Sequence, residues 1–165
     1  MQQPDTDFNR DIVRGKVGED IFKADFLDFL EIDYEDVTNC QRFQVLDTDF
    51  KAKIGTYEIK TNYKDDGQLC IEEFTNINDS LSPISKGWFY KSQADLLVFI
   101  SKKTKVMILV PFTDGFKEYY EFVKDSYTLN RNRISFKGNR RWQSAFRRIP
   151  LDTLKGYYSM YKRIE

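Results

Sequence analysis

The chain has 165 residues and a mass of 19.7 kDa, a size that suits one ordinary domain. Its residues are 41% hydrophobic and 32% charged, a balance typical of a folded protein rather than a disordered or membrane-embedded one. The 26 basic and 26 acidic residues cancel, and histidine is absent, which excludes Ser-His-Asp triads, Cys-His dyads and zinc sites that contain histidine. Any catalysis must therefore use carboxylates, lysine, tyrosine, cysteine or a metal ion with oxygen ligands.

The first predicted element is a helix over Asp7–Leu30, because apolar residues recur there with a period near 3.6. Glu19 lies on the apolar stripe of this helix, where an unpaired carboxylate is unusual. The period then changes to two, which is typical of half-buried strands. The predicted strands are Phe43–Leu46, Asp49–Ile54, Tyr57–Asn62 and Leu69–Phe74, with a tight hairpin turn at Gly55-Thr56.

The second half of the chain alternates short helices with apolar strands. The polar stretch Thr75–Lys86 predicts a long loop. The elements predicted after it are a short helix over Trp88–Ala94, strands at Leu96–Ile100 and Val106–Val110, a helix over Phe112–Asp125 and a final helix over Leu151–Arg163. This order predicts a single α/β (α+β mixed) domain over residues 1–165, with a core over about 8–126, a basic and aromatic extension over 127–165, and a central mixed sheet of four to six strands flanked by helices.

Nothing in the sequence predicts secretion or membrane insertion. The N-terminal residues are polar and acidic, and the longest apolar runs are far shorter than a membrane span. Cys40 and Cys70 are too few for an all-cysteine zinc site and lack C-x-x-C spacing, and two lone cysteines are most simply core residues. We therefore expect a cytoplasmic protein with reduced thiols.

One group of charged residues stands out at the predicted hairpin. On a strand, Glu58 and Lys60 point to the same face and Ile59 points to the other. The turn brings Asp49 alongside this strand, so two carboxylates and one ammonium group converge at one end of the sheet. Hard oxygen ligands of this kind suit Mg²⁺, which keeps part of its water shell. A surface ion pair between Glu58 and Lys60 is the simpler alternative.

With these residues in place, the chain resembles the PD-(D/E)xK nuclease superfamily. That family uses a glutamate on an inner helix, an aspartate on the second core strand and E-x-K on the third. Small phage-type and Holliday-junction-resolvase-like members add further motifs, which here read Ile71-Glu72-Glu73, Gly87-Trp88-Phe89 and Ala94-Asp95-Leu96-Leu97-Val98. The resemblance covers about residues 12–111 and weakens in the basic tail.

The resemblance implies a restriction-endonuclease-like core and metal-dependent hydrolysis of DNA phosphodiester bonds. It places Mg²⁺, with Mn²⁺ as a substitute, on Asp49, Glu58 and the backbone carbonyl of Ile59. It gives Lys60 the task of positioning and activating the attacking water, and Glu19 a second metal or a metal-bound water. Glu19 has an alternative as the ion-pair partner of a lysine on its own helix.

Further residues are secondary candidates. Asp47 is the alternate metal ligand to Asp49. Lys91 and Gln93 fall where some members carry an accessory polar residue, although a solvated helix turn is the simpler explanation for them. An endonuclease fits better than an exonuclease because no added domain for threading DNA is visible. The DNA substrate, whether branched or not, stays open, as does a homodimer.

The charges are unevenly distributed along the chain. Residues 1–50 carry 13 acidic and 5 basic residues, and the remainder carries 13 acidic and 21 basic residues. Seven bases and no acid occur between residues 131 and 148, interleaved with aromatics, which is typical of a DNA-binding segment. These bases are Arg131, Arg133, Lys137, Arg140, Arg141, Arg147 and Arg148. The alternatives are a solvated rim for this segment and, for the whole chain, a non-catalytic module that binds nucleic acid or protein.

Overall fold

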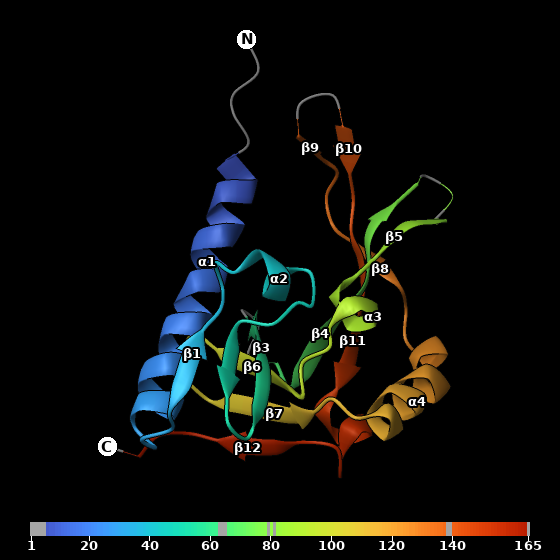
Figure 1. Cartoon of the computed structure of the whole chain (residues 1–165). Coiled ribbons are helices and arrows are strands. Elements are labelled where there is room, and N and C mark those ends of the chain that lie inside the picture. Colours follow the sequence, from blue (N-terminus) through green and yellow to red (C-terminus); the bar gives the residue numbers. More distant parts are fainter. Residues whose placement is uncertain (1–5, 63–65, 79, 81, 138–139, 165) are drawn as a thin grey trace.

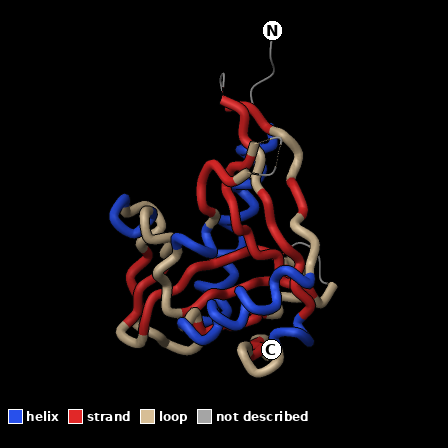
Figure 2. The backbone as a smooth tube through the Cα atoms, turned by 90° about the vertical axis from the view of Figure 1, so that its right-hand side faces the viewer, coloured by secondary structure: helices blue, strands red, loops and turns tan. Residues whose placement is uncertain are grey.

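A six-stranded mixed sheet forms the centre of the molecule, with helices packed on both of its faces (Figure 1 and Figure 2). The computed structural model describes residues 6–62, 66–78, 80, 82–137 and 140–164. The strand order is β1-β2-β3-β6-β7-β12, and β3 and β6 run parallel while the other neighbours are antiparallel. The strands are β1 (Tyr34–Asp36), β2 (Phe50–Ala52), β3 (Gly55–Asn62), β6 (Leu96–Ser101), β7 (Met107–Pro111) and β12 (Ser159–Tyr161). The predicted α/β class and the mixed sheet flanked by helices are confirmed.

The N-terminal helix covers one face of this sheet. It comprises α1 (Thr6–Phe22) and a π-helical continuation over Lys23–Asp28, close to the predicted range. Its apolar side chains, with Phe22 fully buried, pack on a cluster that includes Phe50 and Tyr57. Gly18 permits this close approach, since a Cβ there would lie 2.1 Å from the Thr61 hydroxyl oxygen.

The predicted hairpin is present, and β2 pairs with β3 so that Phe50 lies opposite Tyr57. Gly55 and Thr56 belong to β3 itself, and residues 53–54 form the turn. The strand expected at Phe43–Leu46 is wrong, because residues 41–44 form the short helix α2 (Gln41–Gln44). The outer edge of β2 is paired with β1, and the backbone of this segment forms local hydrogen bonds, such as Gln44 N to Cys40 O at 3.0 Å.

A second, four-stranded sheet lies beside the first, in the order β5-β4-β11-β8. Its strands are β4 (Gln68–Ile77), β5 (Pro83–Lys86), β8 (Asn130–Arg131) and β11 (Ala145–Pro150). The long loop expected over Thr75–Lys86 is therefore wrong at both ends. The Asn76 side chain accepts a hydrogen bond from Gln143 N at 3.0 Å, and Ile77 N donates to Gln143 O at 2.9 Å, so tertiary partners extend the polar end of β4.

Helices α3 (Trp88–Lys91) and α4 (Asp114–Val123) lie with the second sheet on the other face of the central sheet. Phe89, Phe116 and Tyr120 bury their rings there. Thr113 caps α4 by accepting a hydrogen bond from Phe116 N, and a 3₁₀ turn over Lys124–Ser126 follows the helix. The hairpin of β9 (Ser135–Lys137) and β10 (Arg140–Trp142) extends from the body on the same side as the first half of α1 (Figure 1).

The C-terminal segment corrects another expectation. In place of a helix over Leu151–Arg163, a 3₁₀ turn (Leu151–Leu154) is followed by β12, which pairs with β7. Gly156, at φ +96°, breaks the helical path between them. Both cysteines are exposed rather than buried in the core. In the described parts of the chain, no helix is long and apolar enough to cross a membrane.

Candidate active site

Glu58 and Lys60 lie side by side on β3, on the face opposite α1. Glu58 is only 4% exposed, and the Lys60 ammonium group donates a hydrogen bond to its carboxylate. The same ammonium group lies 5.1 Å from the centre of the Trp88 ring on α3. Ile59, between them, is buried in the cluster beneath α1. The alternation of one strand thus buries an ion pair on one face and an apolar side chain on the other.

Asp49 is held beside this strand by two hydrogen bonds. Its backbone N donates to Tyr57 O at 2.8 Å, and its carboxylate accepts from Ile59 N at 2.7 Å. Burial is the main cause that raises the pKa of Asp49 to about 6, and the charges of Glu19 and Asp47 add to it. The structure therefore brings Asp49 to the E-x-K strand, as the sequence predicts.

The carboxylates of the site repel one another. Burial raises the pKa of Glu58 to about 8, with Lys60 opposing the shift and the charges of Asp49 and Asp47 reinforcing it. Burial alone would lower the pKa of Lys60, but the same three carboxylates raise it above its usual value. A group of acids with raised pKa values around one ammonium group is typical of a functional site.

Asp47 occupies a loop next to α3. Its backbone is left-handed, at φ 47°, and the Ser92 hydroxyl donates to its carbonyl at 3.2 Å. The buried Oδ2 atom of Asp47 accepts no hydrogen bond from the described residues and lies 3.8 Å from Lys91 Nζ. Gln93 has an exposed side chain and is anchored by its backbone, whose N donates to Leu46 O at 3.0 Å. The Lys91 side chain thus lies at the edge of the site, whereas Gln93 contributes only a backbone hydrogen bond to the loop that carries Asp47.

Glu72, on β4, also belongs to the site, although it is not among the residues predicted for it. Burial raises its pKa, whereas Lys60, Lys91 and a backbone hydrogen bond from Trp88 favour its charged form. Its Oε1 also accepts from the Thr75 hydroxyl at 3.3 Å. A glutamate inside an apolar, alternating strand was the sequence signal that could have identified it.

Glu19 lies near enough for its charge to raise the pKa of Asp49. Its carboxylate also forms an ion pair with Lys16 at 3.2 Å on the same helix. The structure therefore supports both interpretations of Glu19, as a residue at the edge of the site and as the ion-pair partner of a lysine on its own helix. The packing of α1 on β3 sets the position of Glu19.

Carboxylate oxygens are the potential metal donors at this site. Within the described residues, no group of three or more carboxylate, cysteine or histidine side chains is gathered closely enough to hold a metal alone. The site instead offers two adjacent carboxylates, Asp49 and Glu58, and an orphaned oxygen of Asp47. Mg²⁺ needs only one or two carboxylates and retains water on its remaining positions.

The basic tail divides into structural and exposed residues. Arg147 donates to Glu73 at 2.8 Å and to Asp125 at 3.2 Å, and Arg148 is paired with Asp66. Arg141 donates to Ile77 O and to the Gln143 side chain. Arg131 and Arg133 are exposed, while the side chains of Lys137 and Arg140 lie outside the described part of the structure.

Comparison of the chain with models of protein families, with curated proteins and with solved structures finds no match.

Proposed function

We propose that the protein is a metal-dependent DNA endonuclease that hydrolyses phosphodiester bonds. The observation that carries the proposal is the convergence of Asp49, Glu58 and Lys60. Glu58 and Lys60 lie on β3 and Asp49 immediately precedes β2, the three residues are largely withdrawn from water, and their charges shift one another's pKa values. A purely structural ion pair requires no third carboxylate beside it.

The order of the site residues along the fold supports the same class. Glu19 lies on the helix before the sheet, Asp49 immediately precedes the second strand, and Glu58 and Lys60 lie on the third. This is the arrangement expected of a PD-(D/E)xK nuclease. The exposed Arg131 and Arg133 offer phosphate contacts outside the site.

Each group has a defined task in this proposal. Asp49, Glu58 and the Ile59 carbonyl would hold Mg²⁺, which when bound supplies a Lewis acid and lowers the pKa of a coordinated water. Lys60 has three N–H donors and uses one on Glu58, so the others remain for the attacking water or a phosphate oxygen. Its positive charge stabilises the charge that develops on the phosphate. We place this activity in the cytoplasm.

The test is cleavage of plasmid, four-way-junction and single-stranded DNA in Mg²⁺ or Mn²⁺. Glu58→Gln and Lys60→Ala should each lower the rate by about 100-fold or more. The matched control Glu118→Gln changes an exposed glutamate on α4 and should cut at the wild-type rate. Comparison of the three substrates also reports whether the enzyme prefers branched DNA.

A non-catalytic nucleic-acid-binding module is the second candidate. The observation that favours it is that Lys60 and Lys16 already neutralise Glu58 and Glu19 without a metal. This candidate predicts DNA binding without cleavage, and binding that is equal in wild type, Glu58→Gln and Lys60→Ala. A wild-type rate no higher than that of the folded Glu58→Gln variant would reject the nuclease.

A further inference from the structure

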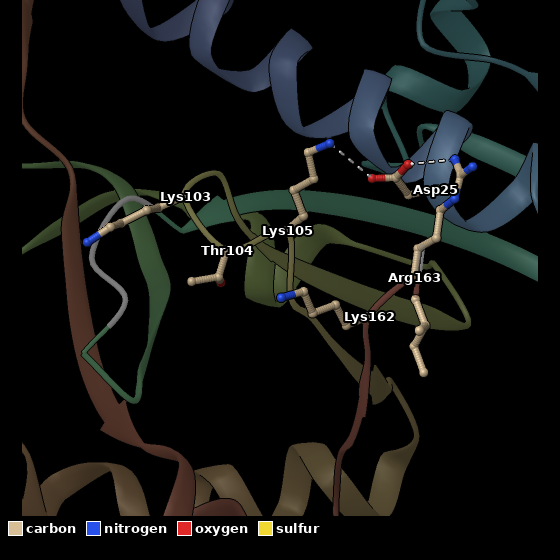
Figure 3. Close-up of a pocket in the computed structure, with 7 residues that line it drawn as sticks. Asp25, Lys103, Thr104, Lys105, Lys162 and Arg163 are labelled. Atoms are coloured by element: carbon tan, nitrogen blue, oxygen red, sulfur yellow. Dashed lines mark hydrogen bonds and ion pairs between the residues drawn. The ribbon is translucent and has the colours of Figure 1, made fainter.

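A second charged site lies away from the candidate active site, where three distant segments meet. It is a pocket of about 630 Å³ between the π-helical end of the N-terminal helix, the β6–β7 turn and the residues that follow β12 (Figure 3). Its polar lining residues are Asp25, Lys103, Thr104, Lys105, Lys162 and Arg163. None of these belongs to the group around Glu58, which faces away from α1.

Among the described residues of the lining, Asp25 is the only acid, and it is 8% exposed. Its carboxylate lies 3.3 Å from Arg163 Nη1 and 3.9 Å from Lys105 Nζ, and Figure 3 shows the two cations reaching it from different segments. Its backbone carbonyl accepts from the Tyr161 hydroxyl at 2.9 Å. One buried carboxylate thus fixes two cations at the pocket wall, and both keep further N–H donors unused by it.

Lys105 adopts a backbone conformation that lysine rarely takes. Its φ is 56°, a left-handed value usually left to glycine or asparagine. The turn is closed by hydrogen bonds from Lys105 N to Ser101 O at 2.7 Å and from Ser101 N to Val106 O at 2.9 Å. Glycine would satisfy this turn more easily, so the turn itself does not explain a lysine at this position.

The pocket carries an excess of positive charge. Of the described residues that line it, four are basic and one is acidic, and Lys103 and Lys162 form no ion pair or hydrogen bond within this part of the chain. Both extend away from Asp25 in Figure 3. The Thr104 hydroxyl accepts a hydrogen bond from Val106 N at 3.5 Å, which leaves its own proton available to donate. Gathering like charges in this way is unfavourable unless an anion compensates them.

We propose that this pocket binds the phosphate groups of an anionic ligand. A guanidinium group, three ammonium groups and a hydroxyl group provide the N–H and O–H donors that phosphate oxygens accept. The excess charge exceeds what a single carboxylate would neutralise, so the ligand carries at least two negative charges. Two sources share this chemistry, a free polyphosphate and successive phosphates of a DNA strand. The proposal does not depend on nuclease activity.

The test uses binding of inorganic pyrophosphate by calorimetry and of a short DNA duplex by fluorescence anisotropy. Lys105→Gly retains the turn while removing one ammonium group, and Lys103→Ala with Lys162→Ala removes two that have no partner among the described residues. Each variant should keep the wild-type melting temperature and weaken binding about tenfold. The matched control is Lys102→Ala with Lys155→Ala, which removes the same charge from exposed lysines outside the pocket.

The two probes separate the sources. Weaker pyrophosphate binding in the pocket variants but not in the control indicates a free phosphate ligand, and weaker duplex binding alone indicates a DNA strand. Equal affinities in wild type, pocket variants and control, or equal losses in pocket variants and control, would overturn the proposal. Glu58→Gln should leave pyrophosphate binding unchanged, so loss of cleavage and loss of pocket binding are distinguishable.

Discussion

Glu58 is a carboxylate that the fold removes from water while placing other carboxylates beside it. Burial raises its pKa to about 8 even though Lys60 donates to it. Its charged form is therefore less stable in the native state than in the unfolded chain. A cation bound beside Glu58, as proposed above, would favour the charged form of this carboxylate.

This imbalance predicts how stability depends on pH. The folded pKa of Glu58 lies above its unfolded value of 4.5, so the native state binds more protons and stability falls as pH rises from about 5 to 8. Glu58→Gln should reduce this fall, by on the order of 1–3 kcal/mol. Urea unfolding at several pH values, in the presence of a chelator, measures the slope. An equally steep fall in the variant would contradict the raised pKa.

Some residues of the site could be predicted from the sequence and others could not. Strand alternation suffices to place Glu58 and Lys60 on one face, and a hairpin suffices to bring Asp49 to them. Glu72 lies on the second sheet, and no local sequence pattern predicts how the two sheets pack against each other. Glu73 shares the period-two face of Leu69 and Ile71, so its burial was readable from the sequence, but its partners Tyr120 and Arg147 were not.

Among the elements, α3 depends on close contact between backbones. The Gly87 backbone N donates to Glu73 O at 2.7 Å, and a Cβ at Gly87 would lie 2.4 Å from Glu72 O. The φ of Gly87 is −76°, so the requirement is one of space rather than of conformation. This contact positions Trp88, whose ring lies over the Lys60 ammonium group.

Gly87→Ala should therefore destabilise the fold by about 2–3 kcal/mol, because β4 must move away from α3. The control is Gly115→Ala, in the exposed first turn of α4, where the nearest atom would be 3.9 Å away. That change should stabilise by about 0.5 kcal/mol through helix propensity. Thermal unfolding of both variants measures the two effects, and a neutral Gly87→Ala would refute the contact.

The elements that the sequence predicted well are those with a strong internal period, such as α1, β3 and β6. The short elements failed because their state depends on partners. Residues 43–46 look like a strand but form local hydrogen bonds instead, and residues 159–161 look helical but pair with the edge of β7. Polar strand ends such as Asn76 are stabilised by distant backbone groups that a local pattern does not contain.

At the scale of the whole molecule, some arginines of the basic tail stabilise the fold and others are exposed on its surface. The Arg147 guanidinium joins β11 to Glu73 on β4, and Tyr120 on α4 donates to the same carboxylate at 2.7 Å. The side chain of Glu73 is 2% exposed. This network ties the second sheet to α4.

Arg147→Ala should destabilise the protein by about 3 kcal/mol, since it leaves Glu73 buried without its cation. Arg133→Ala, at an exposed position of the same tail, should change the unfolding free energy by less than about 0.5 kcal/mol. Chemical denaturation compares them. Equal stability of the two variants would show that the network contributes little.

The exposed arginines instead predict a salt effect. Arg131→Ala with Arg133→Ala should weaken DNA binding and lower the slope of log affinity against log salt by about 1 to 2. Anisotropy titrations of a duplex at several salt concentrations give this slope. The comparison requires that the double variant is folded. An unchanged slope would show that Arg131 and Arg133 do not contact the DNA.

The parallel pairing of β3 with β6 also bears on the order of folding. The β2–β3 hairpin closes over a few residues, whereas the β3–β6 pair joins positions 39 residues apart, as Thr56 and Asp95 do. Non-local pairs of this kind form slowly because loop closure precedes any gain from contact. The hairpin can therefore bring Asp49 and Glu58 together early, while the water-poor surroundings of Glu58 arise only when β6 and α3 dock. Full perturbation of its acidity should accordingly be one of the last properties that the folding chain acquires.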